Sequence, residues 1–126
     1  MYKVYSVTVD GDGQCAVFVI DELNKSLHPD IVRYIVKIFN SNINVKHAQL
    51  IFTTHETSIL RKDLLRRDQI WFCEKQKDKS TTLYPLTSFS PRKDREDIEE
   101  SYLSGRYGGK PIVKPFSFEP LVYLKD

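Results

Sequence analysis

Two adjacent carboxylates follow an apolar run near the start of the chain. The run Val17–Ile20 is apolar throughout, and Asp21 and Glu22 come directly after it. Such a run is typical of a strand that helices cover on both faces, so we expect a central strand over Ala16–Ile20. At the carboxyl edge of an open α/β sheet, Asp21 could hold a magnesium ion while Glu22 polarises an attacking water. A strand that simply ends in a solvated turn explains the pair equally well.

A histidine ends the next strand-like segment. The segment Leu50–Thr53 is a short apolar run, and His55 follows it after one further threonine. A segment of helix length separates the two runs, which suits a strand, helix, strand crossover. Two neighbouring parallel strands would present Asp21, Glu22 and His55 at one edge. A histidine alone at a strand end is more often a structural hydrogen-bonding residue, so only the combination suggests catalysis.

The remaining pattern supplies the elements that would position these side chains. We expect a helix from Asp30 to about Asn40, because Pro29 suits a first helical turn and the segment is rich in apolar residues. The order of elements predicts an α/β fold with parallel strands, helices and a β-hairpin. At the start of the chain, a strand over Tyr2–Val9 is expected to form a hairpin-like opening with Cys15–Ile20 through the turn Asp10–Gly13. Further along, we expect a short amphipathic helix over Thr57–Arg67 and a hairpin of Gln69–Glu74 with Thr81–Leu86. A weak helix is expected around Ile98, Tyr102 and Leu103.

The composition predicts one domain over residues 1–126. The 19 basic and 17 acidic residues leave a net charge of +2, which gives no whole-chain reason to expect a nucleic-acid partner and leaves that partner open. Cys15 and Cys73 form no C-x-x-C pair and no secretory segment is visible, which favours reduced thiols and a cytoplasmic location. The longest apolar run is far shorter than the roughly 20 residues that a membrane span requires, so we expect no membrane partner.

The sequence around both motifs resembles that of the ABC-type ATPases, and in particular that of the AAA/ABC-like ATPases of bacterial abortive-infection and phage-defence systems. The resemblance covers roughly Ala16 to Ile112 and implies the C-terminal half of a P-loop NTPase (ABC ATPase-like) domain. The blocks that carry it are Asp21–Pro29 (DELNKSLHP), Ile51–Thr57 (IFTTHET), Leu64–Phe72 (LLRRDQIWF), Leu83–Leu86 (LYPL) and Tyr102–Gly108 (YLSGRYG).

The resemblance also implies a role for each motif. In those ATPases a magnesium-site aspartate, a catalytic glutamate, a loop that crosses the dimer interface and a switch histidine occur in this order. By resemblance they are Asp21, Glu22, the nucleotide-contacting segment Ser26, Leu27 and His28, and His55. ATP and Mg²⁺ are the implied cofactors, in a complete assembly. The implied partners are an N-terminal ATPase half or an ATPase dimer partner, and a defence effector protein.

The departures from the family pattern concern the phosphate site. The family's phosphate-binding loop, G-x-x-x-x-G-K-[ST], does not occur in this sequence. The segment Gly105–Pro111 has the wrong glycine spacing and a proline in place of the magnesium-binding hydroxyl, so we interpret it as a turn packed by Tyr107 rather than as a phosphate site built on Arg106. The signature helix expected within Met1–Gln14 is also missing. The start at Met1 therefore suggests a truncated gene, one piece of a split ATPase or a cloned fragment.

Other kinds of site find little support in the sequence. The segment Asp10–Gly13 lacks the later glutamate of a calcium loop, and the cysteines and histidines have no zinc spacing. The basic cluster around Arg61 and Arg67 alternates with acids and leucines, which favours a solvated helix face over nucleic-acid binding. Two functions stay open: ATP hydrolysis completed in a larger assembly, and a non-catalytic remnant or interaction module that retains the fold. The chain alone is expected to be inactive.

Overall fold

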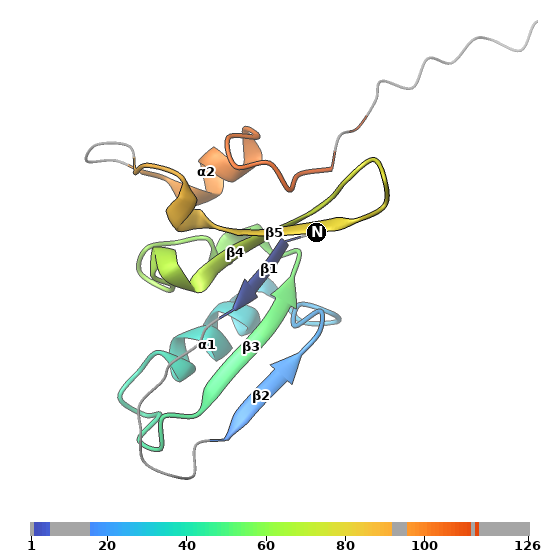
Figure 1. Ribbon diagram of the computed structural model, residues 1–126. Coiled ribbons are helices and arrows are strands. Elements are labelled where there is room, and N and C mark those ends of the chain that lie inside the picture. Colours follow the sequence, from blue (N-terminus) through green and yellow to red (C-terminus); the bar gives the residue numbers. More distant parts are fainter. Residues whose placement is uncertain (1, 6–15, 92–95, 112, 114–126) are drawn as a thin grey trace, which may run out of the picture.

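A five-stranded mixed sheet forms the centre of the molecule, with the strands in the order β2-β3-β1-β4-β5 (Figure 1). The computed structural model describes residues 2–5, 16–91, 96–111 and 113. Its β2 and β3 are parallel, whereas β1 is antiparallel to both β3 and β4, and β4 is antiparallel to β5. The strands are β1 (Tyr2–Tyr5), β2 (Val17–Ile20), β3 (Gln49–Thr54), β4 (Ile70–Lys75) and β5 (Thr81–Pro85), and the helices are α1 (Pro29–Phe39) and α2 (Ile98–Leu103).

The crossover from β2 through α1 to β3 confirms the expected parallel pair. Helix α1 begins where His28 caps it: the backbone N–H of Asp30 donates to Nδ1 of His28 at 3.1 Å. Pro29 occupies the first turn, where its missing N–H costs no helical hydrogen bond. The inner face of the helix buries Val32 and Val36 in the core. The sequence prediction of a helix over this segment is therefore correct.

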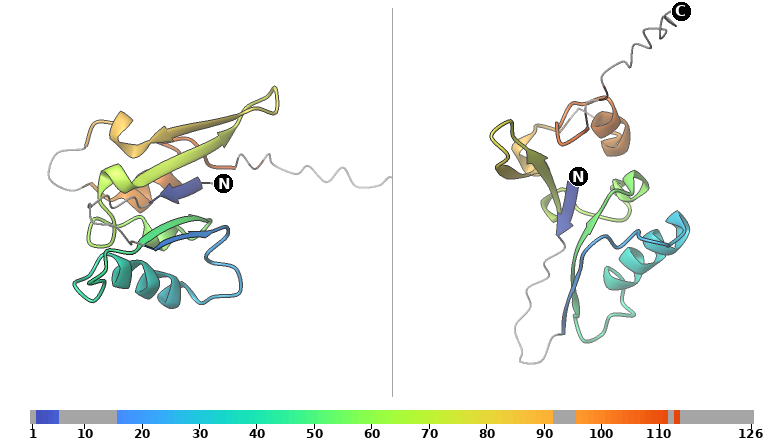
Figure 2. Two further views of the ribbon diagram at one scale, coloured as in Figure 1. Left: turned by 60° about the horizontal axis from the view of Figure 1, so that its bottom comes forward. Right: turned by 90° about the vertical axis from the view of Figure 1, so that its right-hand side faces the viewer.

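The core lies on one face of the sheet, and both helices lie on that side (Figure 2). Its C-terminal part is aromatic: Phe72 on β4 stacks on Tyr102 and Tyr107, with ring centroids 5.6 and 5.3 Å apart. Tyr84 donates a hydrogen bond to the backbone oxygen of Tyr107 at 2.5 Å. The buried apolar residues are Leu23, Val32, Val36, Leu50, Phe52, Ile59, Leu60, Leu65, Ile70, Phe72, Leu86, Ile98, Tyr102 and Tyr107.

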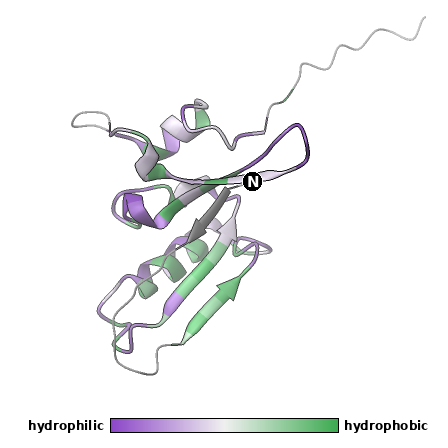
Figure 3. Cartoon of the chain, in the orientation of Figure 1, coloured by the Kyte–Doolittle hydropathy of each residue, from purple (hydrophilic) through white to green (hydrophobic). Residues whose placement is uncertain are grey.

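Strand β2 is not the covered central strand that its apolar run predicts. It is the outermost strand of the sheet, and its four residues are 53, 48, 75 and 37% exposed from Val17 to Ile20. Figure 3 shows the apolar character running along this bare strand and the neighbouring β3. Besides its pairing with β3, β2 contacts the end of α1 through Phe18, whose ring meets Phe39 edge-on with centroids 5.9 Å apart. The apolar pattern is correct, but its cover is missing from the described residues.

Two other sequence expectations are wrong. Strand β1 does not form a hairpin with β2, because it pairs between β3 and β4. Residues 6–15, with the expected turn Asp10–Gly13, lie outside the described residues. The segment Thr57–Arg67 forms no amphipathic α-helix; 3₁₀ turns occupy Thr57–Ile59 and Arg67–Gln69 instead.

The local ion pairs in this segment fit turns better than an α-helix. Arg61 binds Asp63 at 3.0 Å and Arg66 binds Asp68 at 3.1 Å, each across two residues. Side chains two residues apart do not face each other on an α-helix, so these pairs favour turns. The expected β4–β5 hairpin and the helix α2 are both confirmed. None of the helices in the described part of the chain is long and apolar enough to cross a membrane.

Candidate functional site

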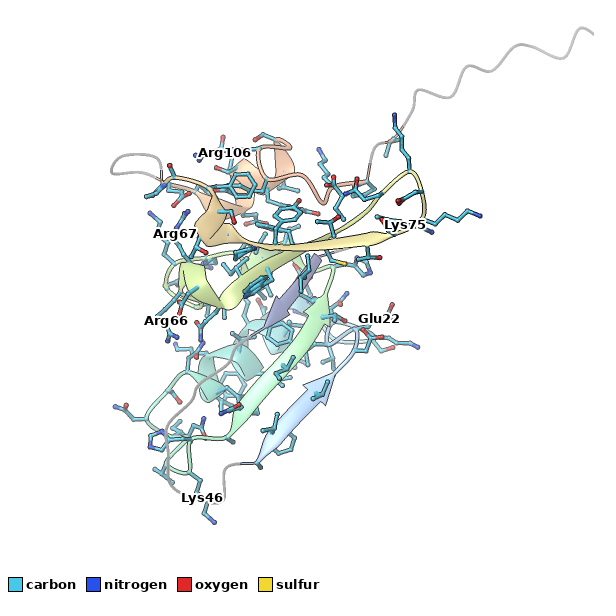
Figure 4. The ribbon with its side chains drawn as sticks, in the orientation of Figure 1. Glu22, Lys46, Arg66, Arg67, Lys75 and Arg106 are labelled. Atoms are coloured by element: carbon cyan, nitrogen blue, oxygen red, sulfur yellow. The ribbon has the colours of Figure 1, made fainter. Side chains whose placement is uncertain are left out.

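The carboxyl ends of β2 and β3 bring Asp21 beside Thr53. Ile20 pairs with Phe52, so the next residue of each strand continues the same register. The hydroxyl of Thr53 donates a hydrogen bond to Oδ1 of Asp21. Figure 4 places Glu22 at this end of the two strands and Lys46 at the opposite end. The predicted carboxylate pair therefore lies at the sheet edge where ligands of α/β folds bind.

Glu22 has an unusual backbone conformation that β3 holds in place. Its φ of 53° lies in the left-handed region, which costs about 1–3 kcal/mol for a residue other than glycine. Its N–H donates to the hydroxyl of Thr53 at 2.7 Å, and the N–H of Leu23 donates to the backbone oxygen of Thr53 at 2.9 Å. These bonds offset the strain. The chain turns away from β2 at the residue predicted to act on water.

Asn24 hydrogen-bonds the loop that follows β2 to Thr54 and His55 at the end of β3. The hydroxyl of Thr54 donates to Oδ1 of Asn24 at 3.0 Å, and the backbone N–H of His55 donates to the same oxygen at 3.3 Å. The turn after His55 is anchored in turn to α1, because Arg33 donates to the hydroxyl of Ser58 at 2.7 Å. The side chain of Asn24 thus links the loop that carries Asp21 and Glu22, here called the carboxylate loop, to the backbone of His55.

The segment Ser26–His28 leaves this edge for α1. Two turn hydrogen bonds shape it, from Lys25 N–H to the oxygen of Glu22 at 2.9 Å and from Leu27 N–H to the oxygen of Asn24 at 3.1 Å. Ser26 also has a left-handed backbone, with φ 61°. Ser26, Leu27 and His28 are all exposed, and the His28 ring caps α1. The segment is accessible to a ligand or partner across the carboxylate edge.

The residues at this edge fit one part of a magnesium–ATP site. Within the described ranges, no three His, Cys, Asp or Glu side chains group as a protein metal site. Magnesium in nucleotide sites usually takes one or two carboxylates and completes its shell with phosphate oxygens and water, a pattern that the exposed Asp21 suits. The amide cradle for the phosphates has no counterpart, because the sequence contains no phosphate-binding loop.

The Gly-Arg-Tyr-Gly block belongs to a structural cluster around Glu96, as the turn interpretation predicts. The Glu96 side chain has no exposed surface; Nη1 of Arg67 donates to it at 2.5 Å and the hydroxyl of Tyr107 at 2.9 Å. Arg106 lies 3.8 Å away and donates to the backbone oxygen of Ser90 at 2.7 Å. Burial opposes a charge on Glu96, but the bonds from Arg67 and Tyr107 and the charge of Arg67 outweigh it and lower the pKa of this carboxyl.

A groove of about 550 Å³ is lined by Leu60–Asp63 and Glu96–Glu99, and none of the residues that form the carboxylate edge line it. Every acidic residue that lines it has a partner: Asp63 binds Arg61, Glu96 binds Arg67, Asp97 caps α2, and Glu99 accepts from Thr57 at 2.8 Å. Each of these carboxylates therefore has a local or tertiary structural role. The groove therefore has a structural explanation, and the sheet edge stays the better candidate site.

Comparison with known families bears on this edge. Residues 6–61 match the family model described as an AAA domain, putative AbiEii toxin, Type IV TA system. The match supports an AAA-type ATPase domain. It covers the carboxylate pair, the segment Ser26–His28 and His55, and the mixed α/β fold with its parallel strand pair is consistent with it. The searches of curated proteins and of solved structures found no match.

The sequence interpretation missed two residues of this edge, Thr53 and Asn24. Both act through long-range hydrogen bonds, across 32 residues from Thr53 to Asp21 and across 30 from Thr54 to Asn24. The only sequence signal is the pair of threonines at the end of an apolar strand, directly before His55.

Proposed function

We propose that this chain supplies the hydrolytic residues of an ATPase of the abortive-infection type, with the phosphate-binding loop contributed from outside these 126 residues. One observation supports the proposal most: the hydrogen bonds of Thr53 and Asn24 join Asp21, Glu22 and the backbone of His55 at one strand edge. The family match over residues 6–61 includes all three.

Each residue has a stated role in this proposal. Asp21 would hold Mg²⁺, which when bound supplies the positive charge that offsets the phosphate oxygens. Glu22 orients a water molecule and accepts its proton as the water oxygen attacks the γ-phosphorus and ADP leaves. His55 contacts the γ-phosphate and distinguishes ATP from ADP. Ser26, Leu27 and His28 reach across to the nucleotide or to the other half of the assembly.

The bare strand β2 supports completion in a larger assembly. Fully burying a Val, Ile or Phe side chain is worth about 1.5–3 kcal/mol, and the four residues of β2 average about half exposed. Covering them would therefore contribute roughly 4 kcal/mol to association. An ATPase half that carries the phosphate loop would cover this strand and complete the site that begins at its end. The active assembly would then control a defence effector.

A non-catalytic interaction module is the second candidate, and the exposure of β2 favours it equally. In that case the chain would dock to another protein through the same strand, and Asp21 and Glu22 would end a strand at a solvated turn. The absence of a phosphate-binding loop from the sequence favours this candidate. The family match over the carboxylates and His55 favours catalysis.

Substitution of Glu22 separates the two candidates. The chain is combined with an ATPase half that carries a phosphate-binding loop, and phosphate release is measured together with nucleotide binding. Glu22→Gln keeps the shape and removes the charge, so it should slow hydrolysis by roughly a hundredfold while ATP still binds. His55→Ala should also slow turnover. Glu100→Gln, an exposed carboxylate on α2, is the matched control and should leave turnover unchanged.

Equal turnover in wild type and Glu22→Gln would end the catalytic assignment of this residue. A partner that binds the chain stably without producing any ATP hydrolysis would instead favour the interaction module.

A further inference from the structure

We propose that Thr53 is a positioning residue that sets the geometry of both adjacent carboxylate residues, Asp21 and Glu22. This inference rests on the proposed function for its catalytic meaning, but its geometric content stands on the hydrogen bonds alone. Thr53 is the residue of β3 that continues the register beside Asp21, and it is only 8% exposed.

A single hydroxyl makes both contacts. A threonine hydroxyl has one proton to donate and lone pairs to accept with. In Thr53 the proton goes to Oδ1 of Asp21, and the oxygen accepts the N–H of Glu22 at 2.7 Å. The first bond fixes the Asp21 carboxylate on the β3 side, which leaves its second oxygen for a cation. The second bond holds the backbone of Glu22 where the chain leaves the strand.

The backbone of Glu22 makes this second bond consequential. Its left-handed φ of 53° is unfavourable for glutamate, so the conformation persists only where surrounding contacts maintain it. The hydroxyl of Thr53 and the backbone oxygen of Thr53 are the partners of the Glu22 and Leu23 N–H groups. Removing the hydroxyl should let the Asp21 carboxylate rotate and the Glu22 peptide open. The hydrogen bond between Asn24 and Thr54 stays intact, so the loss of structure is confined to Asp21 and Glu22.

Thr53→Val tests this role, because valine has the same shape without the hydroxyl. The first measurement is hydrogen exchange of the Glu22 amide in the chain by NMR, which needs no nucleotide or partner. Losing one hydrogen bond of ordinary strength should speed exchange of this amide about fivefold, while amides of the β4–β5 hairpin keep their wild-type rates. Thr53→Ser keeps the hydroxyl and should protect Glu22 as the wild type does.

Thr57→Val is the matched control. It also removes one threonine hydroxyl, which donates to Glu99 at 2.8 Å, but this bond lies outside the carboxylate loop. The control should leave exchange of the Glu22 amide unchanged. In the assembly with the phosphate-loop protein, Thr53→Val should lower kcat at least tenfold with little change in KM for MgATP, and Thr53→Ser should retain the activity.

Wild-type exchange of the Glu22 amide in Thr53→Val, or loss of protection in Thr53→Ser, would overturn the positioning role. An inactive wild-type assembly would overturn the proposed function, and the exchange rates would still decide whether Thr53 holds the two carboxylate residues. An active assembly in which Thr53→Val has wild-type kcat would show that hydrolysis does not depend on this geometry.

Discussion

Glu96 should be the carboxylate on which the stability of the C-terminal part depends most. Its side chain is fully buried, and it receives hydrogen bonds from Arg67 of one segment and Tyr107 of another. Breaking a buried ion pair from one side costs about 3–5 kcal/mol, because the remaining charge loses its partner. Gln at this position keeps one acceptor oxygen, and Arg67 keeps its bonds to the backbone oxygens of Leu86 and Phe89. We therefore expect Glu96→Gln to cost about 3 kcal/mol, at the lower end of that range.

Chemical denaturation at pH 7 measures this loss. A loss of about 3 kcal/mol corresponds to a fall of roughly 10 °C in Tm for a domain of this size. Glu100→Gln, an exposed change on α2, should stay within about 0.5 kcal/mol of wild type. A Tyr107→Phe change should cost much less in the Glu96→Gln background than in the wild type, because the charged acceptor of its hydroxyl is gone.

The pH dependence of the same loss follows from the lowered pKa of Glu96. The unfolded chain protonates this carboxyl near its ordinary value of 4.5, whereas the folded protein keeps it charged at lower pH. Its stabilisation is therefore complete above pH 4.5 and is lost as the pH falls through the folded value. The gap between wild type and Glu96→Gln should shrink in acid. Equal unfolding free energies at pH 7 would refute the reasoning that Glu96 is a charged, buried centre of this cluster.

Three further predictions concern the aromatic core and the isolated chain. Gly108→Ala should lower Tm more than Gly105→Ala. Both glycines have a left-handed φ, but a Cβ at Gly108 would lie 2.8 Å from the Tyr84 hydroxyl, whereas a Cβ at Gly105 would meet nothing within 4 Å. Equal losses of Tm would show that the contact with Tyr84 relaxes freely. Burial raises the pKa of Tyr84 and Tyr102 to about 12 from 10.0, so the unfolding free energy should fall as the pH rises from about 10 to about 12, and Tyr84→Phe should reduce that fall. Calorimetry of the chain alone should detect weak or no ATP binding, because its sequence lacks the phosphate-binding loop that supplies backbone amides and a lysine. Tight, magnesium-dependent binding would show that a phosphate site lies elsewhere in the chain.

The β2, α1, β3 unit could be predicted from the sequence because local patterns determine it. Apolar runs define the two strands, and Pro29 with a segment rich in apolar residues defines the helix between them. The position of β2 as the outermost strand of the sheet could not be predicted. An apolar run indicates that a strand needs to be covered, but not whether another element of the same chain covers it. The turns around Arg61 contain an ion pair between residues two apart, a local geometry that the spacing of leucines does not reveal.

The chemistry of the candidate edge was only partly visible in the sequence. Asp21, Glu22 and His55 stand out because each follows an apolar strand. The contribution of Thr53 depends on the register of β3 against β2, since its partner lies 32 residues away in the chain. The buried position of Glu96 was equally hidden, because this residue lies in a run of charged residues that gives no indication of burial.

Photo-crosslinking from the γ-phosphate of ATP tests the location of the site most directly. An ATP analogue with a photoreactive group on its γ-phosphate is bound to the assembly of this chain with the phosphate-loop protein, and labelled peptides are identified by mass spectrometry. The proposed function predicts label on the peptides that contain Asp21–His28 and His55, and loss of that label when unmodified ATP competes. Label that maps instead to the groove between Leu60–Asp63 and Glu96–Glu99, or that ATP does not displace, would contradict the assignment of the β2–β3 edge as the hydrolytic site.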